Sequence, residues 1–413
     1  MTGYSGPIRG VCEGIFDGPH ATPRESEEGP IFLGIGNVTS DGRLDLSEIR
    51  HVSEQEFPIW TRRVTPQRDD VVFSYEATLH RYARIPENFR GCLGRRMALV
   101  RVDRTKVDPR FLLYYFLSPQ WRRVIEGNVI SGATVDRIPI KRFPSFPVSI
   151  PRIDQQMEIA HILDAYDRLI ENNRRRIRLL EEVARLLYQE WFDRLRFPGY
   201  EHKRISNGLP EGWSKHTLES VCVEGDGIQT GPFGSQLHQS DYCDVGVPVV
   251  MPKDLISFRI LSEGTAQIPE SLAQKLSRHR MTEGDTVYGR RGDIGRRAFV
   301  TARQVGWLCG TGCLRIRPDM KKINSRFLFE ALGSPDTAGT IANRAKGATL
   351  LNLNSTVLKS VPILVPPRLL QDLYASQVQP VENLIDLLSE QNSKLKTARD
   401  LLLPRLMSGE VEV

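Results

Sequence analysis

Residues 152–193 read RIDQQMEIAHILDAYDRLIENNRRRIRLLEEVARLLYQEWFD and contain neither proline nor glycine. With Asn173 counted in the gap, apolar residues recur along this segment in alternating steps of three and four. This heptad pattern is typical of a helix that buries one narrow stripe. The stripe comprises Leu163, Tyr166, Ile170, Ile177, Leu180, Ala184, Leu187 and Trp191. The segment therefore predicts a helix of about forty residues, roughly 60 Å long, that needs a partner.

A matching stripe lies about 215 residues further on, in residues 367–407. Its positions are Val378, Val381, Ile385, Leu388, Asn392, Leu395, Arg399, Leu402 and Leu406. Pro380 falls early in this segment, where we expect it to kink the helix or delay its start, because proline lacks the N–H that a helix needs. The two segments are natural partners, since neither can bury its stripe alone.

The asparagines predict how the two helices pair. If the helices run antiparallel with Asn173 facing Asn392, the other stripe positions meet as Leu163–Leu402, Ile170–Leu395, Leu180–Ile385, Leu187–Val378 and Trp191–Tyr374. A buried asparagine pair costs stability but penalises slipped registers. We therefore expect an antiparallel coiled coil with an Asn173–Asn392 contact. The alternative is that both asparagines lie on solvated flanks.

The two halves of the 413-residue chain, about 1–195 and 210–413, repeat each other at this offset. Four pairs of segments carry the repeat: Gly132-Ala133-Thr134 and Gly347-Ala348-Thr349, Pro147/Pro151 and Pro362/Pro366, Arg110-Phe111-Leu112 and Arg326-Phe327-Leu328, Ser118-Pro119 and Ser334-Pro335. A period this long indicates two whole domains rather than solenoid units. We expect a pseudo-twofold tandem, and the natural partner of such an object has two sites. Double-stranded DNA is the first candidate.

Each copy predicts a mixed α/β domain followed by a long helix. The expected strands are 31–35, 71–75 and 97–102 in the first copy and 247–251, 286–290 and 312–317 in the second, with helices at 108–126 and 324–343. The expected organisation is a first globular domain at 1–150, a long helix at 151–195, a linker at 196–214, a second globular domain at 215–365, and a long helix with its tail at 366–413. The copies diverge after the shared strand, at residues 75–78 against 290–293. This is the pattern expected of two domains that read different sequences.

Composition sets broad limits on function. The chain carries 26% charged residues, a net charge of +6 and a pI near 9.0, which permits a phosphate-rich partner without requiring one. No apolar run approaches the roughly 20 residues that span a bilayer, and the N-terminus has no signal-like stretch, so we expect a cytoplasmic protein. Cys309 and Cys313 lack a second ligand pair, which argues against zinc.

Motifs for the main DNA-directed activities are missing from the sequence. There is no Asn/Asp-Pro-Pro-aromatic loop for amino methylation, no phosphate loop for a motor, and no carboxylate–lysine cluster for a nuclease. Gly34-Ile35-Gly36 is most simply the end of a strand. The stretch GRRGDIG at 289–295 fits either a phosphate-contacting turn or a tight hairpin. We therefore expect a non-catalytic DNA-recognition protein rather than an enzyme, with no metal site.

The order of domains and helices resembles the specificity subunit of type I restriction-modification systems over essentially the whole chain. IPRIDQQMEIAHILDAYDRLI resembles the family's helix entry, LLYQEWFDRLRFPGY is similar to its central exit segment, and LLLPRLMSGEVEV resembles its closing segment. The second helix entry departs from the pattern, with Gln371-Asp372 where Gln-Gln or Glu-Gln is usual. The resemblance implies two target-recognition domains, each reading half of a bipartite DNA site. The helices would set the spacing and dock two methyltransferase subunits, and motor-nuclease subunits would join the complex. This chain would bind no cofactor, while S-adenosylmethionine, ATP and Mg would belong to the partners.

Charge and loop position predict the DNA contacts, because Arg, Lys, Asn and Gln favour base and backbone contacts. They are Arg24, Tyr75, His80, Arg81, Arg95, Arg96 and Thr134 in the first domain, and Gln229, Lys253, Arg290, Arg291, Arg296, Lys346 and Thr349 in the second. Two other interpretations remain open at this point. One is a tandem-domain scaffold that binds proteins and not DNA, and the other is a stand-alone nuclease or methyltransferase with an unrecognised motif.

Overall fold

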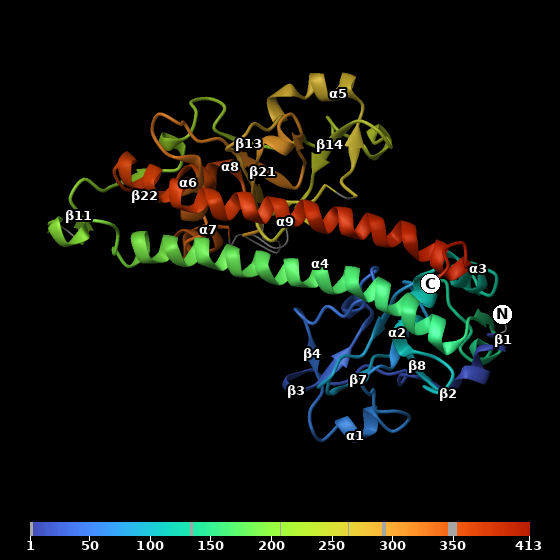
Figure 1. Ribbon diagram of the computed structural model, residues 1–413. Helices are drawn as coiled ribbons and strands as arrows, with labels where there is room; N and C mark the ends of the chain where they lie inside the picture. Colours follow the sequence, from blue (N-terminus) through green and yellow to red (C-terminus); the bar gives the residue numbers. More distant parts are fainter. Residues whose placement is uncertain (1–2, 133–134, 207, 263, 291–294, 346–352) are drawn as a thin grey trace. The chain divides into compact units, whose positions relative to one another are not determined.

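The computed structural model describes residues 3–132, 135–206, 208–262, 264–290, 295–345 and 353–413. The chain divides into two compact units (Figure 1). Unit 1 comprises Met1–Arg175 and Leu388–Val413, and unit 2 comprises Arg176–Leu387. Each unit therefore holds one globular domain together with a part of each long helix.

The domain of unit 1 is built on two sheets. Its strands are β1 (Tyr4–Pro7), β2 (Cys12–Asp17), β3 (Ser26–Leu33), β4 (Arg50–His51), β5 (Val71–Ser74), β6 (Tyr82–Arg84), β7 (Gly91–Leu93), β8 (Met97–Val102) and β9 (Pro147–Ile150). One sheet has the antiparallel order β2-β8-β5-β6. The other has the order β4-β3-β7, with β3 and β7 parallel. Strands β1 and β9 form a separate antiparallel pair beside the long helix entry.

The domain of unit 2 repeats this topology. Its strands are β12 (Ser214–Thr217), β13 (Ile228–Thr230), β14 (Val247–Val250), β17 (Gln267–Ile268), β18 (Thr286–Gly289), β19 (Arg297–Phe299), β20 (Leu308–Cys309), β21 (Cys313–Ile316) and β22 (Pro362–Val365). The orders are β13-β21-β18-β19, β17-β14-β20 with β14 and β20 parallel, and the pair β12-β22. Short ladders β10–β11 (Ile205–Ser206 with Leu209–Pro210) and β15–β16 (Leu255–Ile256 with Arg259–Ile260) are added. The predicted internal repeat is thus confirmed strand by strand.

Five of the six strand predictions hold to within two residues. The prediction 97–102 matches β8, and 71–75, 247–251, 286–290 and 312–317 each contain a strand that is one or two residues shorter. The prediction 31–35 was wrong at both ends, since β3 begins at Ser26 and stops at Leu33. It stops there because the Asn37 side chain accepts a hydrogen bond from the Gly34 N–H at 3.0 Å and starts a short 3-10 turn.

The predicted single helices were also wrong. Residues 108–126 form α2 (Pro109–Leu117) and α3 (Pro119–Glu126), and residues 324–343 form α6 (Ser325–Ala331) and α7 (Pro335–Arg344). Proline disfavours helical backbone in the residue before it, so Ser118 and Ser334 are extended. Each of these serines then caps the following helix through its Oγ. Shorter helices are α1 (Phe57–Trp60), α5 (Glu270–Lys275) and α8 (Ser355–Lys359).

Both long helices are present. Helix α4 spans Ile153–Tyr188 and continues as a π-helical turn over Gln189–Asp193, while α9 spans Arg368–Ser408. Pro380 lies inside α9 and does not delay its start. The heptad stripes face inward, with Leu163, Ile170 and Asn173 buried on α4.

The helices pair antiparallel within each unit. In unit 1, Asn173 contacts Asn392 and Asp167 pairs with Arg399. Residue numbers therefore decrease along α4 in the direction in which they increase along α9. In unit 2 the Tyr374 hydroxyl donates to the Ala184 carbonyl at 3.2 Å. The predicted Trp191–Tyr374 contact is also present there, with ring centroids 6.0 Å apart.

The helix starts are tied to their domains by equivalent buried glutamines. Gln156 accepts a hydrogen bond from the Asp108 N–H at 3.0 Å and donates to the Pro151 carbonyl. Gln371 accepts from the Asn324 N–H at 2.8 Å and donates to the Pro366 carbonyl. Gln371 is therefore the equivalent of Gln156, and both helix entries contain the hydrogen-bonded glutamine. The second entry differs from the first at the preceding position, where Leu370 corresponds to Gln155.

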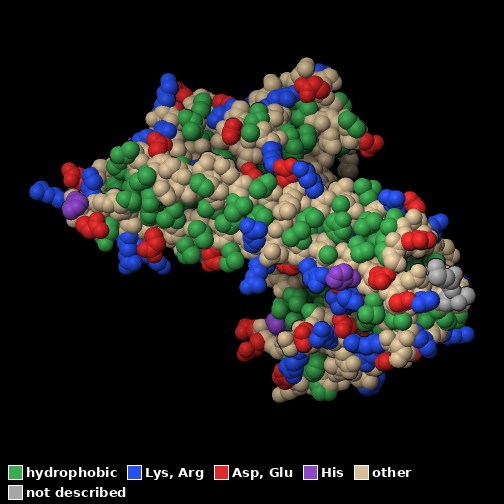
Figure 2. All heavy atoms as spheres, in the orientation of Figure 1, with side chains coloured by type: hydrophobic (Ala, Val, Ile, Leu, Met, Phe, Trp, Pro, Cys, Tyr) green, Lys and Arg blue, Asp and Glu red, His purple; other side chains and the backbone are tan. Residues whose placement is uncertain are grey.

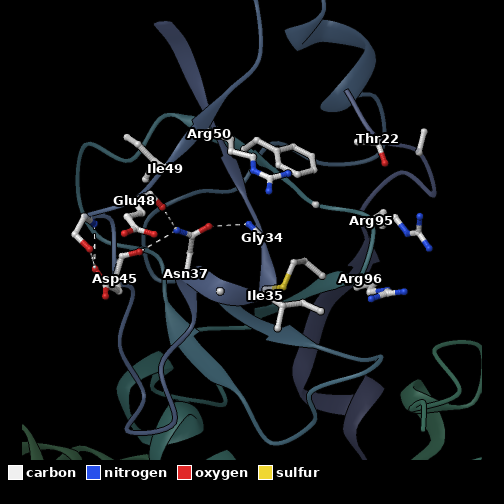
Figure 3. A pocket seen from close by; sticks show the side chains of 16 residues that line it. Thr22, Gly34, Ile35, Asn37, Asp45, Glu48, Ile49, Arg50, Arg95 and Arg96 are labelled. Carbon is white, nitrogen blue, oxygen red and sulfur yellow. Dashed lines mark hydrogen bonds between the residues drawn. The ribbon is translucent and has the colours of Figure 1, made fainter. Parts of the chain in front are cut away.

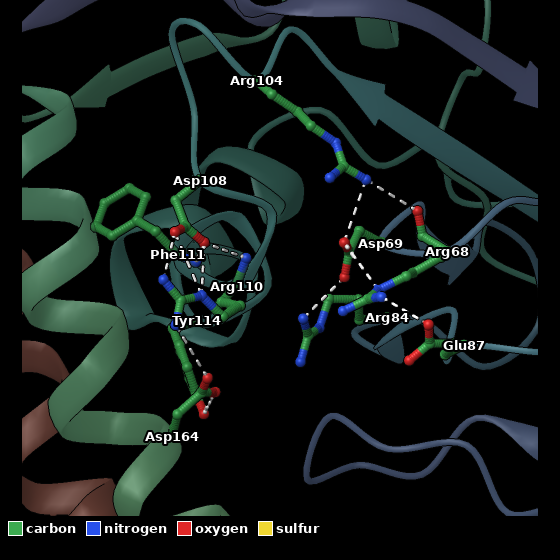
Figure 4. Close-up of polar contacts among 10 residues, drawn as sticks. All are labelled: Arg68, Asp69, Arg84, Glu87, Arg104, Asp108, Arg110, Phe111, Tyr114 and Asp164. Carbon is green, nitrogen blue, oxygen red and sulfur yellow. Dashed lines mark hydrogen bonds and ion pairs between the residues drawn. The ribbon is translucent and has the colours of Figure 1, made fainter.

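Polar contacts also join α2 to α4 in unit 1 (Figure 4). The Asp108 carboxylate caps α2 and binds the Arg110 guanidinium. The Tyr114 hydroxyl donates to Asp164 at 2.8 Å and to Asp167 at 2.6 Å. Since Asp164 and Asp167 lie on α4, this network holds the long helix against the domain.

Candidate nucleic-acid interface

Most arginines of the first domain are neutralised internally. Asp69 pairs with Arg84 at 2.9 Å and with Arg104 at 3.2 Å, and Arg68 pairs with Glu87 at 2.9 Å (Figure 4). A paired guanidinium has less to offer a phosphate or a base. Net charge alone is therefore a poor guide to an interface, and the informative cations are those without an internal partner.

A cleft of about 710 Å³ in the first domain gathers such cations (Figure 3). Its walls come from the segment after β2, the turn after β3, the segment leading into β4 and the β7–β8 turn. The side chains that give it polar character are Thr22, Asn37, Asp45, Glu48, Arg50, Arg95 and Arg96. Figure 3 shows the carboxylates of Asp45 and Glu48 on one side and Arg95 and Arg96 on the other.

The floor of the cleft is fixed by Asn37. Its side chain accepts from the Gly34 N–H and donates to the Asp45 and Glu48 carbonyls at 3.0 and 2.9 Å. Asp45 in turn accepts from the N–H and the hydroxyl of Ser47, which lower the pKa of its carboxyl. These groups have their hydrogen bonds satisfied, so they shape the cleft rather than await a ligand.

The rim of the cleft carries cations of two kinds. Arg96 is paired with Glu76 at 3.1 Å. Arg50 and Arg95 are exposed, and their side chains make no hydrogen bond or ion pair to any described residue. Arg95 was predicted from the sequence, whereas Arg50 and Glu48 were missed. The signal for Arg50 is faint, because β4 has only two residues and its pairing with β3 cannot be read locally.

Other predicted contacts of the first domain have partners of their own. Tyr75 is only 5% exposed, its hydroxyl donates to the Arg95 carbonyl at 2.7 Å, and burial raises its pKa to about 12. Arg81 donates to the Val38 carbonyl at 2.8 Å. His80 lies 3.9 Å from Glu126, and burial lowers its pKa. Arg24 is exposed between β2 and β3. Tyr75 thus supports the cleft from behind, since its side chain is not on the surface.

In the second domain the predicted residues are more dispersed. Lys253 is exposed in the turn after β14, and Arg296 is exposed before β19. Gln229 accepts from Arg278 at 2.8 Å, and Arg290 is buried at 6% exposure. As folded, the Arg290 side chain lies inside the domain rather than on its surface. Four further predictions, Thr134, Arg291, Lys346 and Thr349, lie outside the described residues.

Metal ligands are not clustered in the described part of the chain, where no group of three or more His, Cys, Asp and Glu could hold an ion. Cys309 and Cys313 are buried among apolar side chains, and burial raises the pKa of the Cys309 thiol to about 12. Over the same residues, none of the helices combines the length and the apolar character that crossing a bilayer requires.

Both long helices also carry exposed apolar residues (Figure 2). On α4 in unit 2, Leu179, Val183 and Leu186 are 55%, 53% and 42% exposed. Their spacing of four and three residues places them on one face. On α9, Leu387 and Leu401 are also exposed. Leu179, Val183 and Leu186 therefore form a solvent-exposed apolar face on α4.

The chain thus consists of two α/β domains of the same topology, each followed by a long helix, with a polar cleft in the first domain. The sequence matches the family described as type I restriction modification DNA specificity domain over residues 61–182 and 210–397, well over half of the chain. The chain belongs to this family.

Individual relatives agree with this assignment. The MjaIX specificity subunit of a type I restriction enzyme from Methanocaldococcus jannaschii is 23% identical over 73% of this chain and 69% of its own length. The HindI specificity subunit from Haemophilus influenzae is 21% identical over 92% of this chain and 94% of its own length. The solved S subunit of a type I system from M. genitalium has the same fold, with a TM-score of 0.50 and 17% identity over 98% of this chain and 96% of its own.

Proposed function

We propose that this chain is the DNA-recognition subunit of a type I restriction-modification complex, and that each globular domain reads one half of a bipartite site. The observation that carries the proposal is the repeat itself. Two domains share their strand orders but present different side chains at their surfaces, in a chain of the DNA specificity family. One frame with two sets of contacts is what reading two different half-sites requires.

The long helices would serve as spacer and as dock. Half-sites contacted from one face of B-DNA are about one turn, ~34 Å, apart, and paired helices can hold two domains at a fixed separation. The exposed face of Leu179, Val183 and Leu186 is suited to helices of methyltransferase subunits, two of which would bind one chain. Motor-nuclease subunits would join this assembly.

Catalysis and its cofactors would belong to those partners. S-adenosylmethionine would bind the methyltransferase subunits, ATP and Mg would bind the motor-nuclease subunits, and this chain would bind none of them. The compartment we propose is the cytoplasm, where such a complex meets DNA.

A salt titration of DNA affinity tests the proposal against a protein-binding scaffold. Phosphate contacts release counterions, so log K should fall linearly with log salt at a slope of about −0.9 per contacted phosphate. We expect a steep negative slope and a preference for one bipartite sequence over scrambled DNA. A flat response with no sequence preference would favour the scaffold.

A further inference from the structure

The cleft of the first domain has a counterpart frame in the second. The Gly94 N–H donates to the Leu33 carbonyl at 2.8 Å, and the Gly310 N–H donates to the Val250 carbonyl at 2.8 Å. At the end of each turn a backbone N–H donates to the carbonyl of that glycine, from Met97 to Gly94 and from Cys313 to Gly310, both at 3.0 Å. The β7–β8 turn and the β20–β21 turn are therefore the same structure.

The opposite wall is shared as well. Asn37 and Asp254 are both buried, and each accepts a side-chain hydrogen bond from the backbone N–H three residues earlier, from Gly34 at 3.0 Å and from Met251 at 2.8 Å. The carbonyls of Asn37 and Asp254 then accept from Asp45 and Leu261 at 2.8 and 2.9 Å. Both turns are short 3-10 segments, Ile35–Asn37 and Pro252–Asp254.

A third wall is fixed by strand register. Arg50 of β4 lies opposite Phe32 of β3. The equivalent of Phe32 is Val249, whose N–H donates to the Ala266 carbonyl at 2.8 Å. Ala266 therefore occupies the place of Arg50.

On this common frame, equivalent rim positions carry different side chains in the two domains. Position by position, the residues are Gly36 and Lys253, Arg50 and Ala266, Arg95 and Thr311, Arg96 and Gly312. The first domain carries its cations on β4 and on the β7–β8 turn, whereas the second carries one on the turn after β14. Two domains with the same backbone frame but with cations at different positions are suited to reading different base edges.

We propose that these four pairs of positions are where each domain reads its half-site, with Arg50 and Arg95 contacting base edges in the first domain and Lys253 in the second. The inference rests on the proposed function. Arg50 and Arg95 are exposed without a hydrogen bond or ion pair to any described residue, so they can meet DNA without breaking an internal bond.

The chemistry of the rim narrows the target. Arginine matches the O6 and N7 acceptors of guanine with two parallel hydrogen bonds, and lysine also binds these atoms. Glu48, across the cleft, can accept a hydrogen bond from the amino group of cytosine. The first half-site should therefore contain at least one G·C pair that depends on Arg50 or Arg95.

The test is a methylation map of the complete methyltransferase complex carrying R50A, R95T or K253G. Each substitution installs the residue that the other domain holds at the same place in the frame, so folding should be preserved. We expect R50A and R95T to relax a position in the first block of the motif and to weaken binding of the cognate site by about tenfold to hundredfold. K253G should relax the second block only. R62A, which removes an exposed arginine outside the cleft lining, is the matched control and should leave both blocks intact.

Three outcomes separate the possibilities. Relaxation confined to the predicted block supports the inference. An unchanged motif, or an equal loss of affinity on all sequences, overturns it, since the latter marks phosphate contacts alone. If the unmodified chain itself specifies no bipartite motif with an active partner, the proposed function fails and not merely the placement of the cleft.

Discussion

The Asn173 side-chain amide donates to the Asn392 side-chain oxygen at 3.0 Å, between the two long helices in unit 1. Asn173 is only 1% exposed, and it also donates to Gln391 at 3.1 Å. The contact was predicted from the heptad stripes, and it is present. Since the two asparagines can hydrogen-bond to each other in one register only, we infer that this contact selects the alignment of α4 and α9.

Replacing Asn173 and Asn392 with leucine should show how much the asparagine pair contributes to stability. N173L alone should cost about 0.5–1.5 kcal/mol of unfolding free energy, because the polar side chains across the seam lose their partner. The double change N173L/N392L should recover stability or exceed that of the original chain, since it replaces the polar pair with apolar side chains that can pack against each other. Urea unfolding measures both. N172L, at the exposed neighbouring position, is the control. A double variant less stable than N173L would contradict the account.

Glu181 should make stability depend on pH. It lies on α4 in unit 2, and its buried Oε1 has no hydrogen-bond partner among the described residues. Burial, with a contribution from the Glu382 carboxylate, raises its pKa to about 7, against the lowering effects of Arg259, Arg178 and Arg326. The folded state therefore holds this proton more tightly than the unfolded state does. Its contribution is most favourable below the ordinary value of 4.5 and is lost as pH rises from there to about 7.

The variant E181Q should accordingly be more stable than the original chain at pH 8 and similar to it at pH 4.5. Thermal unfolding at both values measures the difference. E182Q alters the exposed neighbouring glutamate and should shift neither curve. Equal stability of E181Q and the original chain at pH 8 would argue against a buried, desolvated carboxyl.

The exposed apolar face of α4 should hold the methyltransferase subunits. L179E/V183E places charges where an apolar helix would pack, so we expect at least tenfold weaker copurification of the methyltransferase subunit. Free DNA binding by the chain should persist, because the globular domains are untouched. S393E adds a charge at an exposed position of α9 and should retain the partner. Retention of the partner by L179E/V183E would place the dock elsewhere.

The ion pair between Asp167 and Arg399 should matter more than its surface counterparts. Arg399 occupies a stripe position, and its side chain is 8% exposed. D167A removes the hydrogen bonds that Asp167 accepts from Arg399 and Tyr114, while Asp400 remains as a partner of Arg399. We therefore expect D167A to destabilise the chain by about 1.5–3 kcal/mol. R122A, which breaks the exposed pair with Glu126, should cost under about 1 kcal/mol. Similar losses for D167A and R122A in denaturant unfolding would contradict the assigned difference in burial.

The sequence predicts features that depend on local spacing. The stripes of α4 and α9 and their register follow from steps of three and four residues, because helical periodicity brings those positions together. The helix breaks at Ser118 and Ser334 also follow from local sequence, since each of these serines precedes a proline.

The interface depends on pairings that spacing does not reveal. Arg50 reaches the cleft because β4 pairs with β3, and Arg95 because the β7–β8 turn closes beside it. Of the DNA contacts predicted from charge and loop position, Arg95 and Arg96 line the cleft, whereas the side chains of Tyr75 and Arg290 are buried. Which charges are neutralised internally is a tertiary property, so the free cations could be identified only from the fold.

A methylation map is the most direct test of the central claim. The chain would be expressed with and without its methyltransferase partner in a host that lacks other DNA methylation, and modified bases would be mapped at single-molecule resolution. We predict one bipartite motif, two specified blocks around unspecified bases, that appears only when both chains are made. Exchange of either globular domain should change one block. No new methylation, with the partner shown to be active alongside another specificity chain, would contradict the account.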